Sequence, residues 1–167
     1  LMDLWCSRHL GRPFDAGDAF ADSGTVIEPL LQMCLAEPFF RLPPPKSTGR
    51  DLFHAEWLTT RLDRLPSAPA EDVQATMCEL TARVCADAVG EHAGPARELI
   101  VCGGGSLTLS LMRRLAEQLP GVSVVTSDDK GLPATQVEAA AFAWLAWAHV
   151  ARHPANLPRA TGASGLR

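Results

Sequence analysis

The feature that most constrains this chain is a run of three glycines at the end of a short apolar segment. Residues 98–102 read ELIVC, and Gly103, Gly104 and Gly105 follow directly. Three consecutive residues without a Cβ let another molecule approach the backbone closely, and a helix that begins after them points its free N–H groups at that molecule. The same pattern also makes a plain tight turn between a strand and a helix. The spacing alone leaves a ligand site and a simple turn both open.

The glycine run lies within a regular alternation of helical and strand patterns. Apolar residues recur at helical spacing over 70–90, and the strand at 98–102 is followed by a helix from about 107 to 118. A second strand is predicted at 121–126 and a further helix at 136–152. The order helix–strand–helix–strand–helix predicts an α/β layer with parallel strands. In open sheets of this kind ligands bind at the carboxyl ends of the strands, where the glycines lie.

The last predicted helix is apolar on nearly every side. Ala139, Phe142, Trp144, Leu145 and Trp147 are distributed around it rather than along one stripe. A helix that is hydrophobic all round is normally enclosed by the rest of the protein. We therefore expect this helix to be central and buried, with both tryptophans in the core.

The first 66 residues differ from the rest in their pattern of predicted elements. Short helical patterns are separated by turn signals, and three consecutive prolines at 43–45 break the chain. We expect a helical and loop region over 1–66 and an α/β region over 67–167. Both ends of the chain read as parts of a longer sequence. The short helices are predicted at 1–10, 25–36 and 54–65.

Composition excludes several classes of function. The chain has 167 residues, enough for one substantial core, and a net charge of −4 that argues against a nucleic-acid surface. The sequence shows no apolar run long enough to span a bilayer and no signal-peptide pattern. Its five cysteines are an odd number with apolar neighbours, which predicts reduced, buried thiols in a cytoplasmic protein. No cysteine or histidine spacing indicates a metal site.

The familiar nucleotide fingerprints are incomplete. The dinucleotide pattern needs a third glycine where this chain has Thr108, and the P-loop sequence Gly-Lys-Ser/Thr does not occur. Asp128 and Asp129 follow the second predicted strand, where a carboxylate could bind a ribose hydroxyl or a metal ion. Acidic pairs in loops are usually only solvated, so both interpretations stay open.

Two other segments carry polar groups with a possible role in binding. Lys46 and Arg50 follow the proline run and could present donors to an anion, although composition favours a solvated surface loop with two unrelated cations. Thr135 and Glu138 have the spacing of a capping box at the start of the last helix. The Glu138 carboxylate could cap this helix and also contact a polyhydroxylated ligand.

Several segments together resemble the anhydro-N-acetylmuramic acid kinase family, bacterial sugar kinases of the actin-like ATPase superfamily. The most specific are PPPKSTGRDLF, which ends at Phe53, and EAAAFAWLA, which begins at Glu138. The resemblance covers nearly the whole chain in order. The resembling stretches are 1–13, 23–53, 100–105, 137–146 and 156–163.

The resemblance implies a fold of two ribonuclease-H-like domains around a cleft. This chain would supply most of the C-terminal, second domain, with helices packed on a mostly parallel sheet. Residues 1–66 would lie on the substrate side and residues 67–167 on the nucleotide side, and the N-terminal domain would be absent from the chain. A homodimer is compatible with this architecture.

The resemblance also implies a reaction. The family phosphorylates the 6-oxygen of 1,6-anhydro-N-acetylmuramic acid with ATP while water opens the anhydro ring, giving N-acetylmuramate 6-phosphate during cell-wall recycling. Mg²⁺ would accompany the ATP. The alternatives are a Rossmann-type nucleotide-binding module, or a non-catalytic interaction domain that binds a partner through its proline loop.

Few functional residues carry over from the family. Gly103, Gly104 and Gly105 match the loop that approaches the nucleotide, and Glu138 matches a glutamate that contacts the sugar. Lys46 and Arg50 lie in a family signature without individual roles. Thr108 replaces the usual asparagine, and Leu107 is also unusual there.

No catalytic residue is expected in this chain. The family's general base belongs to a DTGPGN-like segment that would end just before Leu1, and the phosphate-binding glycine loop lies farther upstream. The chain alone is therefore expected to be inactive.

Overall fold

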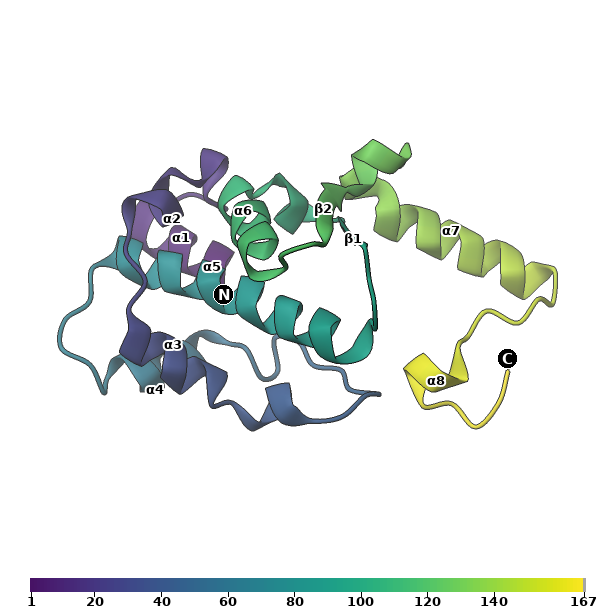
Figure 1. Cartoon of the computed structure of the whole chain (residues 1–167), viewed down its shortest axis with the longest axis horizontal. Helices are drawn as coiled ribbons and strands as arrows, with labels where there is room; N and C mark the ends of the chain where they lie inside the picture. The colour runs from purple at the N-terminus through teal and green to yellow at the C-terminus, as the bar shows by residue number, and fades with distance from the viewer. Residues whose placement is uncertain (167) are drawn as a thin grey trace.

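The computed structural model describes residues 1–166, apart from the side chain of Arg159. A 23-residue helix, α5 (Ala70–His92), runs through the middle of the molecule (Figure 1). Three shorter helices of the first region, α1, α2 and α3, pack along it, α4 packs on α3, and α6 with a small sheet lies beside it. The other helices are α1 (Met2–Leu10), α2 (Ala19–Ser23), α3 (Glu28–Leu35), α4 (Ala55–Leu62), α6 (Leu109–Gln118), α7 (Val137–Val150) and α8 (Pro158–Thr161).

The sheet has two parallel strands, β1 (Glu98–Val101) and β2 (Ser123–Thr126). Ile100 lies opposite Val125, and α6 forms the crossover between the two strands. This confirms the predicted alternation of helices and strands and the α/β class. Two strands do not test the ribonuclease-H-like arrangement, which stays a prediction. Short 3₁₀ turns complete the chain: η1 (Ala16–Asp18), η2 (Pro38–Arg41), η3 (Gly104–Leu107), η4 (Ser127–Lys130) and η5 (Ala134–Gln136).

Helix α5 belongs to two hydrophobic clusters at once. Val73 and Met77 face a cluster that includes Trp5, Leu30 and Trp57. The next face of the helix carries Cys78 and Ala82, which pack against Leu111 and Leu115 of α6. Because successive helix residues are turned by about 100°, neighbouring positions serve both clusters. The long helix therefore joins the first region to the α/β region.

Polar contacts fix how the first region lies on α5. The N–H of Ile27 donates to Thr76 Oγ1 (2.9 Å), and the N–H of Thr25 donates to Asp72 Oδ1 (2.7 Å). These bonds keep residues 25–27 extended, which is why α3 begins at Glu28 rather than at the predicted residue 25.

Gly24 lies against the backbone of α5. A Cβ at this position would lie 2.1 Å from the carbonyl oxygen of Glu71. The close approach therefore requires glycine here.

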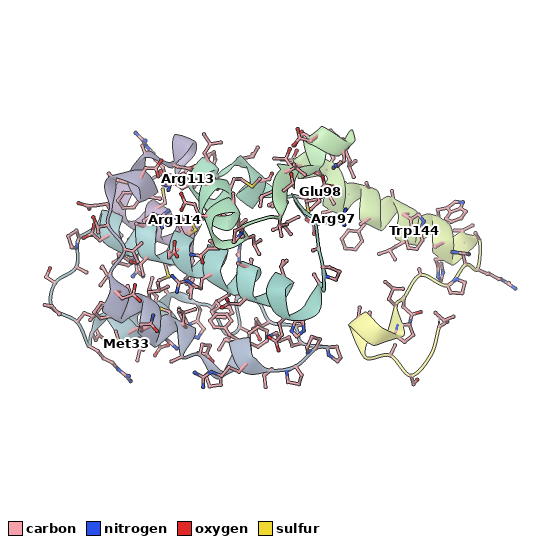
Figure 2. All side chains as sticks on the ribbon, viewed as in Figure 1. Met33, Arg97, Glu98, Arg113, Arg114 and Trp144 are labelled. Atoms are coloured by element: carbon pink, nitrogen blue, oxygen red, sulfur yellow. The ribbon has the colours of Figure 1, made fainter. Side chains whose placement is uncertain are left out.

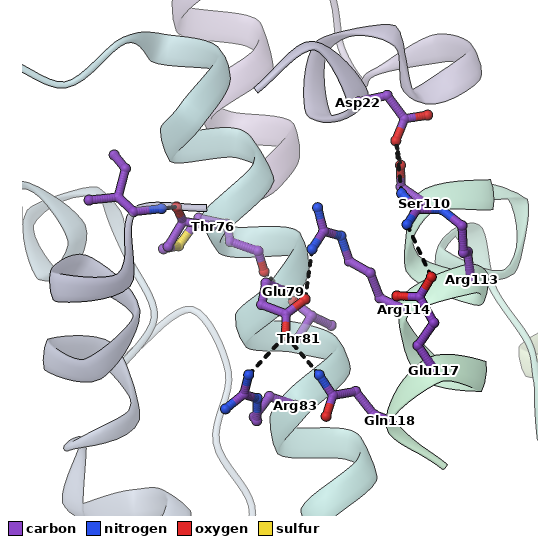
Figure 3. Close-up of polar contacts among 12 residues, drawn as sticks. Asp22, Thr76, Glu79, Thr81, Arg83, Ser110, Arg113, Arg114, Glu117 and Gln118 are labelled. Atoms are coloured by element: carbon purple, nitrogen blue, oxygen red, sulfur yellow. Dashed lines mark hydrogen bonds and ion pairs between the residues drawn. The ribbon is translucent and has the colours of Figure 1, made fainter. Parts of the chain in front are cut away.

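A buried carboxylate joins α5 to α6 (Figure 3). Glu79 accepts hydrogen bonds from Arg114 (2.7 Å), Gln118 (2.8 Å) and Arg83 (3.2 Å). Burial alone would raise the pKa of Glu79. The hydrogen bonds and positive charges of Arg114 and Arg83 lower it by more, so the pKa lies below its ordinary value. The carboxylate is thus held ionised between the two helices.

The prediction that the last helix is buried is wrong for this chain. Helix α7 projects from the rest of the molecule (Figure 1), and Ala148 is its one buried residue. Phe142 is 65% exposed, Trp144 46% and Trp147 58%. The tryptophans therefore do not belong to the core; the ring that contacts both of them is His153, just after the helix.

Several smaller expectations can also be compared with the structure. Helix α5 continues past Gly90 to His92, and α6 begins at Leu109 because a 3₁₀ turn comes first. All five cysteines are free; Cys6, Cys34 and Cys78 are buried as predicted, whereas Cys85 and Cys102 are exposed. Within residues 1–166, no helix has both the length and the apolar character needed to cross a membrane.

Candidate functional site

The glycine run forms the turn between β1 and α6. Gly103 has φ +76°, a conformation that side chains with a Cβ rarely adopt. Its N–H donates to the Ala134 carbonyl (2.9 Å), and its own carbonyl accepts from the Ser106 hydroxyl (2.7 Å). The turn is therefore held by bonds within the chain, and it places η5 directly beside the end of β1.

Gly104 and Gly105 border a cavity of about 670 Å³. A Cβ on Gly104 would meet no atom within 4 Å, and one on Gly105 would lie 3.4 Å from Leu111 Cδ2. Packing within the chain therefore does not require glycine at position 104, whereas a molecule in the cavity could. The cavity is lined by Met2, Asp3, Phe14, Asp15, Ala16, Gly17, Asp18, Gln74, Thr81, Gly104, Gly105, Leu107, Thr108 and Leu111.

A carboxylate of the chain occupies the start of α6. Asp18 is 2% exposed and accepts a hydrogen bond from the Ser110 N–H (2.8 Å). Burial raises the pKa of Asp18, and the hydrogen bonds from the backbone of Ser110 and Leu109 oppose that rise. Asp22 accepts a short hydrogen bond from the Ser110 hydroxyl (Figure 3). The Ser110 N–H at the start of α6 is therefore bonded within the chain and does not point at a ligand.

The wall of the cavity is acidic as well as apolar. Asp3, Asp15 and Asp18 all line it, and Asp15 also accepts from the N–H groups of Phe20 (3.1 Å) and Ala21 (2.8 Å). Like charges repel, so this lining disfavours a polyphosphate and tolerates an uncharged group. The cavity suits the nucleoside part of a nucleotide better than its phosphates.

Gln74 adds an unexpected polar group to the same wall. It is 1% exposed, and neither its amide oxygen nor its amide nitrogen has a partner among the described residues. A buried amide without hydrogen bonds costs about 1–3 kcal/mol. No sequence pattern indicates this unpaired amide, because Gln74 lies within an ordinary helical pattern.

Glu138 lies near the glycine turn but not in the cavity. It is exposed in the first turn of α7, four residues after Ala134, whose carbonyl accepts from Gly103. The predicted capping box with Thr135 is wrong, because α7 begins without a side-chain cap and 134–136 form a 3₁₀ turn. The Glu138 carboxylate has no hydrogen-bond partner within residues 1–166, so it is free to contact a ligand.

The acidic pair after β2 has structural roles. Asp129 Oδ2 accepts from the N–H (2.9 Å) and hydroxyl (3.1 Å) of Thr126, and the Thr126 side chain accepts from the Asp129 N–H, so a capping box begins η4. Asp128 Oδ2 accepts from the Ala134 N–H (3.2 Å). Neither carboxylate is simply solvated. No group of three or more possible metal ligands occurs in the part of the chain that the structure describes.

Lys46 lines a second cleft, of about 780 Å³, which residues of α3, η2 and the second half of α5 also border. Lys46 Nζ donates to the carbonyls of Phe40 (2.7 Å) and Phe39 (3.3 Å), so it holds its own loop together. Arg50 is exposed. A separate, smaller cleft, of about 310 Å³, is lined by Leu1, Met2, Asp3, Phe40, Phe53, Met77, Leu80, Thr81 and Val84.

Comparison with known proteins gives one consistent result. A family model described as anhydro-N-acetylmuramic acid kinase matches residues 1–167. Proteins of that name from Cupriavidus pinatubonensis and Chromobacterium violaceum are 53% and 52% identical over the whole of this chain. The chain spans 45% and 46% of their lengths. It belongs to the anhydro-N-acetylmuramic acid kinase family.

Proposed function

We propose that the full-length protein is an ATP-dependent kinase acting on 1,6-anhydro-N-acetylmuramic acid in cell-wall recycling. ATP would phosphorylate the 6-oxygen, water would add at the anomeric carbon as the anhydro bond opens, and ADP and N-acetylmuramate 6-phosphate would be released. The observation that carries this proposal is the family match along residues 1–167. It favours the kinase over a Rossmann-type module or an interaction domain. We place the reaction in the cytoplasm, where ATP is available.

In this proposal the chain supplies the second domain of the kinase. Residues 67–167 form its nucleotide side, with Gly103 shaping the turn and Gly104 and Gly105 bordering the ligand. The open space above Gly104 and the acidic cavity wall support contact with the nucleoside rather than with the phosphates. The phosphates would then lie toward the domain that this chain lacks.

The sugar would lie toward residues 1–66, with Glu138 as its contact in the α/β region. The exposed, unpaired carboxylate of Glu138 can accept hydrogen bonds from sugar hydroxyl or amide groups. Glu138 is outside the cavity at Gly104, which is consistent with separate places for sugar and nucleoside.

The groups that drive phosphoryl transfer would come from outside this chain. Phosphoryl transfer needs a base that orients the nucleophile, donors that hold the phosphates and Mg²⁺ that neutralises their charge. The described residues offer no cluster of three metal ligands, so we assign no Mg²⁺ ligand to them. We therefore propose that residues 1–167 alone do not phosphorylate the anhydro sugar.

The proposal is tested by measuring ADP release with the anhydro sugar as acceptor. The full-length protein should release ADP only when the sugar is present, and residues 1–167 alone should release none. A full-length protein that binds ATP but does not phosphorylate the anhydro sugar would refute the substrate. Turnover by residues 1–167 would refute the proposal that the groups driving phosphoryl transfer lie outside this chain.

A further inference from the structure

Gln74 lies where the cavity beside the glycine turn meets the contact between α5 and α6. It precedes Cys78 by four residues and Ala82 by eight, so the three side chains share one face of α5. That face packs on α6, the helix that carries Arg113 and Arg114 in Figure 2. Cys78 and Ala82 are fully buried and apolar, whereas Gln74 brings an amide to the same row at 1% exposure. Packing between the two helices therefore does not account for a glutamine at this position.

The amide of Gln74 offers a hydrogen-bond donor and an acceptor side by side. Its oxygen and its nitrogen are both buried, and neither has a partner within residues 1–166. Buried side-chain amides are nearly always hydrogen-bonded, so this one is suited to a partner that enters the cavity. The terminal torsion of a glutamine is broad. The amide can therefore turn toward a ligand while α5 stays in place.

The rest of the cavity wall indicates what kind of group that partner is. Phe14 and Leu107 line the cavity with apolar side chains that are 58% and 65% exposed, which suits the faces of a flat ring. Asp3 and Asp15 add negative charge, which disfavours a phosphate in the same space. The lining together with the amide of Gln74 favours an uncharged, flat group with a hydrogen-bonding edge. A nucleobase has these properties.

We propose that Gln74 selects adenine in the nucleotide site. Adenine carries its N6 amino donor next to a ring-nitrogen acceptor, and a glutamine amide matches that pair with two hydrogen bonds. The amide oxygen accepts from the amino group, and the amide nitrogen donates to the ring nitrogen. The inference rests on the proposed function, which puts a nucleoside in the cavity beside Gly104. It adds which base the cavity prefers and which side chain makes the choice.

The test is calorimetric titration of the full-length protein with two nucleotides that differ by one amino group. ADP carries the N6 amino group, and the diphosphate of purine riboside lacks it. The unsubstituted protein should bind ADP at least about tenfold more tightly, because the amide oxygen stays unpaired without that group. Gln74→Leu should bind the two nucleotides with affinities within about twofold of each other. A Gln74→Leu protein that keeps the tenfold preference would overturn the proposal, as would an unsubstituted protein that binds both equally.

Gln32→Leu is the matched control for this substitution. Gln32 is exposed on α3, donates to Glu28 (2.7 Å) and does not line the cavity, so this variant should keep the preference for ADP. Melting temperatures without ligand verify the fold of each variant. If Gln74→Leu melts lower than the unsubstituted protein, Gln74→Met keeps the length of the side chain and gives the same comparison. An unsubstituted protein that binds neither nucleotide would refute the nucleotide site itself, and the proposed function with it.

Discussion

The buried carboxylate of Glu79 makes the strongest prediction about stability. Its side chain is 9% exposed and bonds Arg114, which is 14% exposed, so most water is excluded from this pair. Glu79→Gln keeps the shape of the side chain but removes its charge, which leaves Arg114 buried without a counter-ion. Arg83 is 36% exposed and can turn to solvent, so losing its ion pair with Glu79 costs less than losing that of Arg114.

The expected loss follows from this burial. Removing one partner of a buried ion pair costs about 3–5 kcal/mol, and the partial exposure of Arg83 favours the lower end, about 3 kcal/mol. In a chain of this size that corresponds to a fall in melting temperature of roughly 6–12 °C. Urea unfolding of residues 1–167, followed by circular dichroism, measures the loss.

Glu117→Gln is the matched control. Glu117 pairs with Arg113 on the same helix α6, but the two side chains are 60% and 53% exposed. Exposed pairs contribute little, so this variant should lose less than about 0.5 kcal/mol. If Glu79→Gln is as stable as Glu117→Gln, the reasoning about the α5–α6 contact is refuted.

The same contact sets a pH dependence. The pKa of Glu79 lies below its ordinary value of 4.5, so the stabilisation is fully present above pH 4.5 and is lost as the pH falls through the lowered pKa. The Glu79→Gln variant lacks that titrating group. Its stability should therefore fall less steeply with acid than that of the unmodified chain.

Three further substitutions test other parts of the molecule. Gly24→Ala should cost about 1–3 kcal/mol because its Cβ would lie 2.1 Å from the Glu71 carbonyl oxygen, whereas Gly90→Ala, with no atom within 4 Å, should be neutral or stabilising; equal unfolding curves would contradict this. Gln74→Leu should raise the free energy of unfolding of residues 1–167 by about 1 kcal/mol because it removes an unpaired buried amide, and a decrease in urea unfolding would count against that view. Glu138→Gln in the full-length protein should raise KM for the sugar at least about tenfold and leave KM for ATP unchanged. An unchanged sugar KM would remove Glu138 from the site.

Local patterns in the sequence were sufficient for most of the fold. The helical spacing of α5, the two β-rich segments and the glycine turn predicted the α/β order that the structure contains. These elements are specified by residues close together in the chain. The start of α3 was misplaced because distant groups, Asp72 and Thr76, hold residues 25–27 extended.

The site was less predictable because it depends on contacts between distant segments. Asp18 caps α6 although 92 residues separate it from Ser110, and no spacing rule connects the two. The unpaired amide of Gln74 likewise appears only when the first region folds onto α5. The burial expected for α7 failed for another reason, since an apolar pattern predicts that a helix is covered but does not identify the segment that covers it.

The central claim is that the space above Gly104 receives the nucleoside of ATP. Gly104→Val in the full-length protein adds a side chain at a position where a Cβ meets no atom of the chain within 4 Å, and Gly90→Val is the control at an equally open position of α5. Calorimetric titration with ADP should show binding weakened at least about tenfold by Gly104→Val and unchanged by Gly90→Val, with equal melting temperatures without ligand. Unchanged ADP affinity in a folded Gly104→Val protein would contradict the claim.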